Sequence, residues 1–377
     1  MLTKILFIYY QNIKSGSVAK VLTTLANELA GDYDITILLL MRPHESFYEL
    51  DKRIKLIFVD SFAYPTFKIT HFINKYLKFL PKRNNIKSYI YDFGAHQTLK
   101  KWLKENHQDY STIISCWYKL STGISLNKKI ARKTIAWEHT NYNVGGKLRK
   151  DTLRPYYKNL KSVVCINKAS ENYYKKFNSQ VFWIPNIMSD LFEKSQFVPF
   201  EEKENKISFL GRLDADKNVG ELIDIFKESE TRGWKLQIIG DGVLKNQLEN
   251  YVKEHRLSEK IEFLGQKSQE ESKKLLEKSK VFGFTSKVEG LPMVLIEAMF
   301  CSNVLLSYDC NYGPADIINE NNGFLIPMHD KEMFRRKLEF LISNPDELEK
   351  LSKSAFNDAQ NWKKEKRIEQ WERILTD

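Results

Sequence analysis

Short runs of apolar residues alternate with longer amphipathic stretches from one end of the chain to the other. Buried strands of a parallel sheet are continuously apolar, whereas a crossover helix repeats its apolar residues every three or four positions. Within residues 17–30, Val18, Leu22, Leu25 and Leu29 recur at that helical spacing between two strand-like runs. The pattern predicts a βαβ unit at the start of the chain and the α/β class throughout.

Strand-like runs occur in both halves of the chain. The first half has them at 4–10, 35–41, 54–60, 111–117, 133–139, 162–167 and 181–186. The second half has them at 207–212, 235–242, 260–266, 280–286 and 303–309, with helical patterns at 219–228, 243–257 and 268–279. This order predicts two doubly wound, Rossmann-like domains, with a ligand in a cleft between them, beyond the C-terminal ends of the strands.

A polar, acidic stretch without strand patterns, at residues 187–205, separates the two halves. We therefore expect a first domain at 1–190 and a second at 191–360, which suits a chain of 377 residues. The last residues, 361–377, are expected to form a helix that packs back on the first domain.

Charge is divided unevenly between the halves. Residues 1–190 contain 30 Lys and Arg against 14 Asp and Glu, a balance of +16, and residues 191–377 contain 29 against 34, a balance of −5. A basic half indicates either a polyanionic partner, such as nucleic acid or an anionic membrane face, or a solvated Lys-rich surface. Residues 69–83 interleave lysines with aromatic residues. That segment fits a membrane leaflet and a helix packed on the sheet equally well.

The cellular location is predicted from three features. Cys116, Cys165, Cys301 and Cys310 form no C-x-x-C pair and lie mostly in apolar runs, which suits the reducing cytoplasm. Met1 leads directly into a strand-like run, so no signal peptide is expected. Since no apolar run reaches about 20 residues, any membrane contact is expected to be peripheral, on the inner face of the cytoplasmic membrane.

Two carboxylates flank a Gly-Leu-Pro turn in the second half. Glu289 precedes Gly290, Leu291 and Pro292, a proline that suits the first residue of a helix, and Glu297 lies one to two turns inside that helix. Free N–H groups at a helix start can receive a phosphate, and ionised carboxylates accept hydrogen bonds from sugar hydroxyls. The alternative is that both acids simply complement the helix dipole.

A second candidate cluster follows the strand at 207–212. Gly211 permits a close backbone approach, and Arg212 and Lys217 can place two positive charges beside a diphosphate. The next strand exit supplies Gly240, which either approaches a ligand or only forms a turn. The D-A-D sequence at 214–216 lies inside this basic loop and not at a strand end, so we expect no Mg²⁺ site and no metal cofactor.

These pieces resemble family 4 of the retaining glycosyltransferases, which have the two-domain GT-B architecture. The matching stretches, within residues 207–327, are GRLDADKN, IIGDG, IEFLGQ, EGLPMVLIE, YGPADII and NNGFLIP. The resemblance implies that Arg212 and Lys217 bind the nucleotide diphosphate, Glu289 lies by the donor sugar, and Glu297 holds the ribose hydroxyls. It also implies that Gly265 and Gln266 meet the base.

The resemblance is weaker in the first half. The family's Gly-Gly pair is reduced to Gly16 followed by serine, so close approach to the donor phosphate is only partly kept. His139 follows a predicted strand where the family often has a histidine near the donor sugar, although a lone histidine there is more often structural. Pro185 and Asn186 match the family's hinge, without its glycine.

The resemblance implies a retaining, metal-independent hexosyltransferase. It would move a hexose or N-acetylhexosamine, most commonly from UDP, to a saccharide acceptor of capsule, lipopolysaccharide, teichoic acid or protein glycan, which can be lipid-linked. The catalytic candidates are Glu289, His139, Arg212 and Lys217. A sugar-nucleotide epimerase of the same fold remains an alternative. No G-x-G-x-x-G supports an NAD enzyme, and nucleic-acid binding would leave the ordered motifs unexplained.

Overall fold

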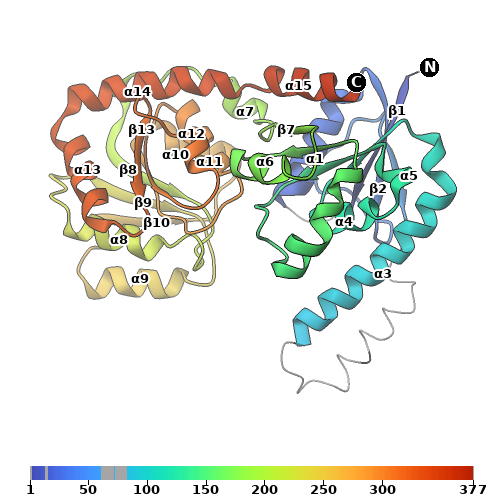
Figure 1. Ribbon diagram of the computed structural model, residues 1–377. Coiled ribbons are helices and arrows are strands. Elements are labelled where there is room, and N and C mark those ends of the chain that lie inside the picture. Colours follow the sequence, from blue (N-terminus) through green and yellow to red (C-terminus); the bar gives the residue numbers. More distant parts are fainter. Residues whose placement is uncertain (1, 13–15, 61–71, 73–82, 377) are drawn as a thin grey trace. The chain divides into compact units, whose positions relative to one another are not determined.

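The computed structural model of the protein describes residues 2–12, 16–60, 72 and 83–376. The chain divides into two compact units, one made of Met1–Pro185 with Ile368–Asp377 and the other of Asn186–Arg367. Each unit contains a parallel sheet connected by helices (Figure 1), so the predicted pair of doubly wound domains is confirmed. The expected cleft depends on how the units are placed relative to each other and stays a prediction.

The first unit is built on a seven-stranded sheet in the order β3-β2-β1-β4-β5-β6-β7. Its strands are β1 (Thr3–Tyr9), β2 (Tyr33–Leu39), β3 (Lys55–Phe58), β4 (Thr112–Ser115), β5 (Thr134–Glu138), β6 (Ser162–Cys165) and β7 (Val181–Trp183). Ile5 of the interior strand β1 pairs with Ile35 on one side and Thr112 on the other. The side chains of residues 5–8 are all inaccessible to solvent, so both faces of the sheet are covered.

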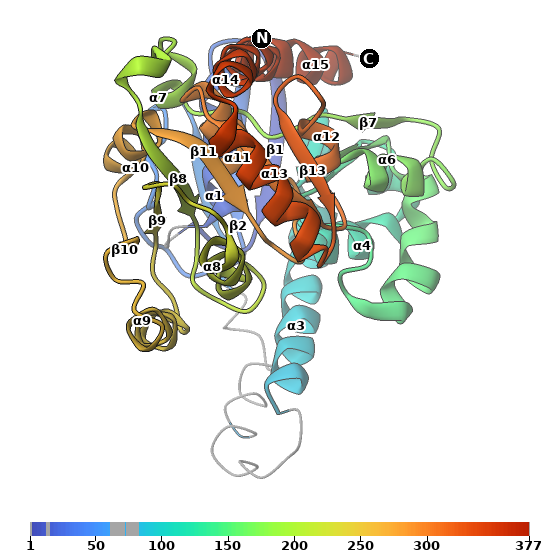
Figure 2. The ribbon, with the colours of Figure 1, turned by 90° about the vertical axis from the view of Figure 1, so that its left-hand side faces the viewer.

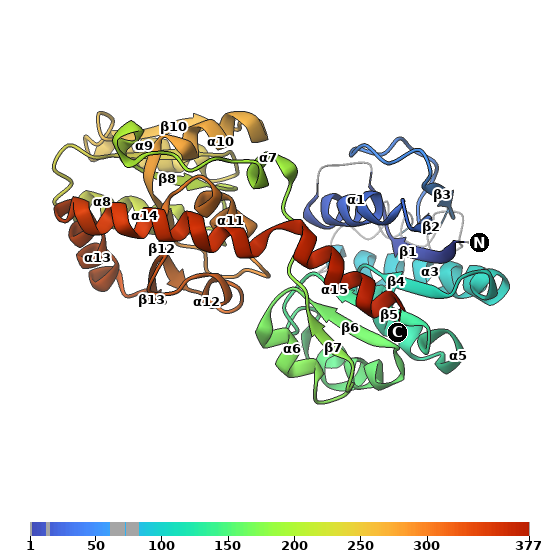
Figure 3. The ribbon, with the colours of Figure 1, turned by 90° about the horizontal axis from the view of Figure 1, so that it is seen from above.

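Helices of the first unit connect these strands. They are α1 (Ser17–Leu29), α3 (Arg83–Asn106), α4 (Tyr118–Ser125), α5 (Lys128–Ala131) and α6 (Lys168–Tyr174), with tighter or wider turns at 107–109, 148–153 and 154–159. Helix α6 lies beside β6 and β7 (Figure 3). The last helix, α15 (Lys364–Thr376), brings Trp371 against Trp137 of β5, with ring centroids 4.9 Å apart. Both indoles are buried, so the chain's C-terminal residues complete the core of the first unit.

The second unit has a six-stranded parallel sheet in the order β10-β9-β8-β11-β12-β13. Its strands are β8 (Glu204–Leu210), β9 (Lys235–Ile239), β10 (Ile261–Gly265), β11 (Ser279–Phe284), β12 (Val304–Asp309) and β13 (Gly323–Pro327). The sequence pattern did not predict β13, which is short, begins with glycine and ends with proline. A Cβ atom on Gly323 would lie 2.0 Å from the carbonyl oxygen of Leu305, so glycine is needed for this edge strand to pair closely with β12.

Helices cover both faces of this second sheet. They are α7 (Asp190–Glu193), α8 (Val219–Glu228), α9 (Lys245–Glu254), α10 (Gln269–Glu277), α11 (Met293–Phe300), α12 (Pro314–Ile317), α13 (Lys331–Ser343) and α14 (Pro345–Ala359), with 3₁₀ turns at 200–202 and 360–362. Helices α8 and α13 pack side by side (Figure 2). A large apolar cluster joins α8, α9 and α13 to β8, β9 and β12. It holds the helix starts at the C-terminal edge of the sheet.

Candidate functional site

Three glycines predicted to approach the donor lie at neighbouring strand ends of the second sheet. Gly211 follows β8, Gly240 follows β9, and Gly265 ends β10. The N–H of Gly211 donates to the carbonyl of Ile239 at 3.0 Å, and the N–H of Gly240 donates to that of Gly265 at 2.8 Å. A Cβ atom on Gly240 would lie 1.9 Å from the carbonyl oxygen of Gly211, and its φ is +142°. Glycine is therefore required at 240, and the three strand ends carry no side chains that would keep a ligand away.

The basic loop after β8 is shaped by Asp214. One carboxylate oxygen, Oδ1, accepts the backbone N–H groups of Asp216 and Lys217, each at 3.1 Å, which forms the local turn that aspartate favours. The other oxygen pairs with Arg212 at 3.0 Å. The side chain of Arg212 is 72% exposed, so its guanidinium is accessible to an anion. Asp214, the first aspartate of the D-A-D sequence, thus organises the loop.

Lys217 and Glu289 meet across this edge although they come from different loops. The Nζ of Lys217 lies 2.5 Å from Oε1 of Glu289, and the two side chains are only 19% and 11% exposed. The ammonium also lies 5.7 Å from the ring centroid of Phe284, the last residue of β11. The N–H of Lys287 donates to the carbonyl of Asp216 at 2.8 Å and ties the two loops together. Two of the predicted catalytic residues therefore form one partly buried ion pair.

The loop that carries Glu289 continues into helix α11. The helix begins at Met293 because Pro292, with ψ of 85°, is still outside the helical region and acts as the N-cap. The expectation that the proline is the first helical residue was thus wrong by one position, and Gly290 and Leu291 lie in the loop that precedes the helix. Glu297, in the second turn, is partly buried. The predicted carboxylates therefore lie on the same loop-to-helix segment.

A second matching motif packs directly on this loop. Gly313, which precedes the short helix α12, has φ of +102°. A Cβ atom there would lie 2.5 Å from Cδ of Pro292 and 3.2 Å from the carbonyl oxygen of Gly290. Only glycine permits this approach, which brings the 312–318 motif against the 289–297 motif.

The residues expected to meet the base lie after β10. Gln266 is exposed, and Gly265 has φ of +69°, a conformation that glycine adopts without strain. The sequence did not single out Lys245, the first residue of α9. Its Nζ pairs with Asp241 at 3.4 Å and would lie 3.9 Å from a Cβ atom on Gly265. A third cation therefore lies near the glycine edge.

Two predicted site residues belong to the first unit. Gly16 is exposed and precedes α1, its carbonyl accepts the N–H of Lys20 at 2.9 Å, and its N–H donates to the hydroxyl oxygen of Tyr48 at 3.3 Å. Its φ of −164° is open to any residue, so the backbone conformation alone does not require glycine. His139 follows β5 at the C-terminal edge of its own sheet.

Both ring nitrogens of His139 are buried. Among the described residues, neither ring nitrogen has a hydrogen-bond partner, although both are buried. The ring packs on Trp137 with centroids 4.3 Å apart. Burial lowers the pKa of His139 to about 3, so the imidazole is neutral at physiological pH. A neutral imidazole offers one donor and one acceptor, which suits a hydroxyl group.

The neighbouring Glu138 was not predicted, because it reads as part of the strand. Its carboxylate is fully buried and accepts hydrogen bonds from the hydroxyls of Tyr157 at 2.7 Å and Tyr174 at 2.8 Å. Burial raises the pKa of Glu138, and the positive charge of the buried Arg154 and the two hydrogen bonds offset part of that rise. This cluster fixes the end of β5, and with it the backbone of His139.

The expected membrane contact is only partly covered by the described residues. Apart from Phe72, residues 61–82 lie outside the described residues. Contact of the basic aromatic segment with a membrane therefore stays a prediction. No helix in the described part of the chain is both long enough and apolar enough to cross a membrane. All four cysteines are buried and free, and burial raises the pKa of their thiols.

The second unit matches a known protein family, and nearly the whole chain is similar to known proteins. Residues 191–358 match the model of the family described as glycosyl transferases group 1. Over 373 residues the chain is 27% identical to the amylovoran biosynthesis glycosyltransferase AmsD of Erwinia amylovora, covering 96% of each protein. Over 379 residues it is 28% identical to a Campylobacter jejuni protein named GalNAc-alpha-(1->4)-GalNAc-alpha-(1->3)-diNAcBac-PP-undecaprenol alpha-1,4-N-acetyl-D-galactosaminyltransferase, covering 97% of this chain and 96% of that one.

Solved structures are similar over nearly the whole chain. The lipopolysaccharide outer core galactosyltransferase WaaB superposes with a TM-score of 0.76 at 18% identity, covering 99% of both chains. HepE from Anabaena, in complex with UDP, superposes with a TM-score of 0.73 at 15% identity, covering 99% of this chain and all of that one. At such identities the likeness concerns the fold.

Proposed function

We propose that this chain, a glycosyltransferase whose residues 191–358 belong to the glycosyl transferases group 1 family, moves a hexose or N-acetylhexosamine from a UDP-sugar to a saccharide acceptor. Its two parallel-sheet units have the GT-B architecture of the similar solved structures. The observation that carries the donor site is the contact of Lys217 with Glu289, beside strand ends that consist of glycine.

The acceptor we propose is a growing cell-surface saccharide that is linked to a lipid. Two similar proteins support this class by their names, one through amylovoran biosynthesis and the other through transfer to a sugar on undecaprenol diphosphate. The first half of the chain carries a balance of +16, which suits the anionic surface where such a lipid is found. The protein would then act in the cytoplasm, at the inner face of the membrane.

The donor diphosphate would lie at the glycine edge of the second sheet. Lys217 and the exposed Arg212 supply positive charge, and Gly290 and Leu291 lie in the same loop as Glu289, the partner of Lys217. A phosphate that binds Lys217 competes with Glu289 for its ammonium, which frees the carboxylate to accept a sugar hydroxyl. Glu297 would hold the ribose, and Gly265 and Gln266 the base.

Transfer of the sugar requires the protein to stabilise the leaving UDP and to hold the acceptor in place. Asp214 holds the backbone of Lys217 and pairs with Arg212 before the donor arrives, so only the side-chain partners need to change for both cations to stabilise the developing charge. We propose retention by a front-face route, in which the leaving phosphate accepts the acceptor's proton. This route requires no metal. His139 would bind a donor-sugar hydroxyl through its buried nitrogens.

The first experiment is thermal unfolding with a panel of nucleotides and nucleotide sugars, with and without EDTA. A ligand that binds only the folded state stabilises it by mass action and so raises the unfolding midpoint. At a ligand concentration of a hundred times Kd, the stabilisation is about 2.7 kcal/mol. A rise with UDP or one UDP-sugar that survives EDTA supports the proposal. A rise only with NAD would contradict it. Release of UDP that does not depend on an acceptor saccharide would favour the epimerase.

A further inference from the structure

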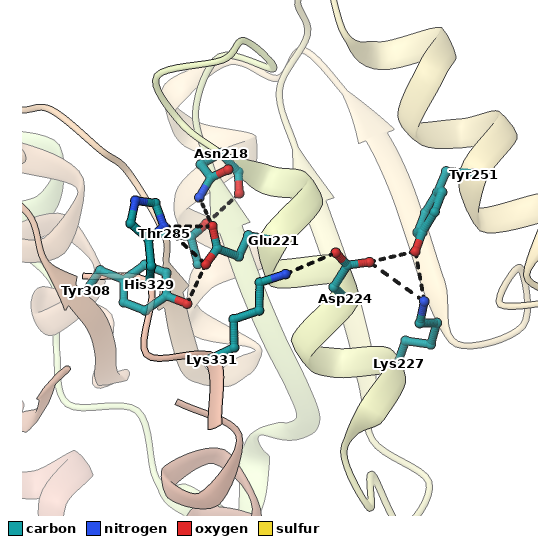
Figure 4. A network of polar contacts seen from close by, with 9 residues as sticks. All are labelled: Asn218, Glu221, Asp224, Lys227, Tyr251, Thr285, Tyr308, His329 and Lys331. Carbon is teal, nitrogen blue, oxygen red and sulfur yellow. Dashed lines mark hydrogen bonds and ion pairs between the residues drawn. The ribbon is translucent and has the colours of Figure 1, made fainter. Parts of the chain in front are cut away.

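A buried carboxylate, Glu221, lies in the first turn of α8, four positions after Lys217, with Asn218, Tyr308 and His329 around it (Figure 4). Its residue is 9% exposed, so its charge must be met by hydrogen bonds. The side-chain amide of Asn218 donates to Oε2, the hydroxyl of Tyr308 donates to Oε1 at 2.8 Å, and Nδ1 of His329 lies 3.3 Å from Oε2. Burial raises the pKa of Glu221, but these contacts outweigh it and hold the pKa below its ordinary value.

The contact with Asn218 matters because of that residue's backbone. Asn218 has φ of 53° and ψ of 37°, the left-handed conformation, which asparagine adopts more readily than most residues but less readily than glycine. Its side chain accepts no hydrogen bond from the backbone N–H groups at the start of α8. It donates to the Glu221 carboxylate instead. The hydroxyl of Thr285 donates to the Asn218 carbonyl at 3.1 Å. Glu221 and Thr285 thus hold this left-handed residue from two sides.

Lys217 is the residue immediately before Asn218. The direction in which the chain enters α8 is therefore set by the left-handed turn, and that direction places the ammonium of Lys217 at 2.5 Å from Glu289. If Asn218 returned to a right-handed conformation, Lys217 would leave the turn that Asp214 organises, and its side chain would no longer face the loop before α11.

A second polar cluster on the same helix leads away from the site. Asp224, one turn further along α8, accepts the hydroxyl of Tyr251 at 2.6 Å and pairs with Lys331 at 3.4 Å (Figure 4). Within the described part of the chain, Asp224 makes no hydrogen bond or ion pair with Asn218 or Lys217. Asp224 is therefore a matched control, an acid on the same helix with a similar number of polar contacts but no route to the site.

We propose that Glu221 is a positioning residue for donor binding, which acts through Asn218 on Lys217. The proposal rests on the proposed function, in which Lys217 binds the donor diphosphate. Tyr308 and His329 extend the same device, since they connect the end of β12 and the turn after β13 to the carboxylate. The hydrogen bonds to Glu221 would hold the loop that carries Lys217 in its binding conformation before UDP arrives.

The test is calorimetric titration of UDP into variants of the full chain. Glu221→Met keeps the volume but removes every acceptor, and it should raise the Kd for UDP about tenfold, equivalent to about 1.4 kcal/mol. Adding Asn218→Gly should restore the Kd to within about threefold of wild type, because glycine adopts the left-handed conformation without Glu221. Asp224→Leu should lower the thermal midpoint and leave the Kd unchanged.

Three outcomes would overturn the proposal: an unchanged Kd in Glu221→Met, a double variant no better than the single one, or an equal loss in Asp224→Leu. Should Glu221→Met fail to fold, the comparison of Asn218→Ala with Asn218→Gly replaces it, since only the alanine variant should lose affinity. Lys217→Ala separates the two proposals. If it binds UDP normally, the donor site itself is wrong; if only Lys217→Ala loses affinity, the positioning role alone is wrong.

Discussion

Lys217 and Glu289, separated by 72 positions in the sequence, share a contact of 2.5 Å in which both side chains are mostly buried. Each residue neutralises the other's charge, and a buried pair loses more from the removal of one partner than an exposed pair does. Removing Lys217 and removing Glu289 should therefore have different consequences for a donor that binds at Lys217.

Replacing Glu289 with alanine should separate binding from turnover. Lys217 keeps its charge and loses a competitor, so UDP affinity should be unchanged or tighter. Turnover should fall by about 100-fold or more, the usual cost of losing a preorganised polar contact to the reacting sugar. Steady-state kinetics with the donor found by the thermal panel would measure both. Glu270→Ala, on the exposed first turn of α10, is the control. Near-normal turnover in Glu289→Ala would remove Glu289 from the catalytic residues.

Gly240→Ala should weaken both the fold of the second unit and its donor site. The new methyl group would collide with the carbonyl oxygen of Gly211, and φ of +142° disfavours alanine. Strain and overpacking together should cost about 2–4 kcal/mol of unfolding free energy. Gly233→Ala is the matched control, because its φ is +84° and nothing lies within 4 Å of the added carbon. It should cost about 1 kcal/mol. Equal urea midpoints for the two variants would contradict the collision.

Strands and helices could be predicted because their signals are local. Every strand of the first sheet, and five in the second, overlap a predicted apolar run, although β1, β2, β8 and β11 begin one to three residues before it. The exception, Gly323–Pro327, is a half-buried edge strand whose apolar run is short. Glu289 and Lys217 could be chosen as candidate site residues because each follows a strand in a motif of known spacing, and the structure brings their side chains together.

The supporting residues of the site could not be predicted in the same way. Glu221 looks like an ordinary first-turn acid, and Tyr308 and His329 approach it from 87 and 108 positions away. Glu138 looks like the end of an apolar strand, and its partners Tyr157 and Tyr174 lie in other elements. Contacts between distant elements form through the tertiary fold, and spacing along one sequence does not reveal them.

His139→Phe should change stability and activity in opposite directions. The phenyl ring keeps the packing on Trp137 and removes two buried nitrogens that have no partner among the described residues. Stability should therefore stay equal or rise by about 1 kcal/mol, since unsatisfied buried groups are costly. Turnover should fall if a nitrogen binds the donor sugar. A variant that is more stable and fully active would make His139 a packing residue only.

Glu193, which lies beside the N–H of Lys364 in the second unit, should make the stability of the protein depend on pH. Burial raises the pKa of Glu193 to about 7 from an ordinary value of 4.5. The folded protein thus holds this proton more tightly than the unfolded chain, so the stability that Glu193 contributes is fully present below pH 4.5 and is lost as pH rises to 7. Glu193→Gln keeps an acceptor for the Lys364 N–H and cannot ionise. At pH 8 it should be more stable than wild type by about 1–2 kcal/mol, a value discounted for partial exposure, and at pH 4.5 the two should agree. Thermal or urea unfolding at both pH values measures the difference. A variant less stable than wild type at pH 8 would show that Glu193 is ionised and favourably paired in the folded protein.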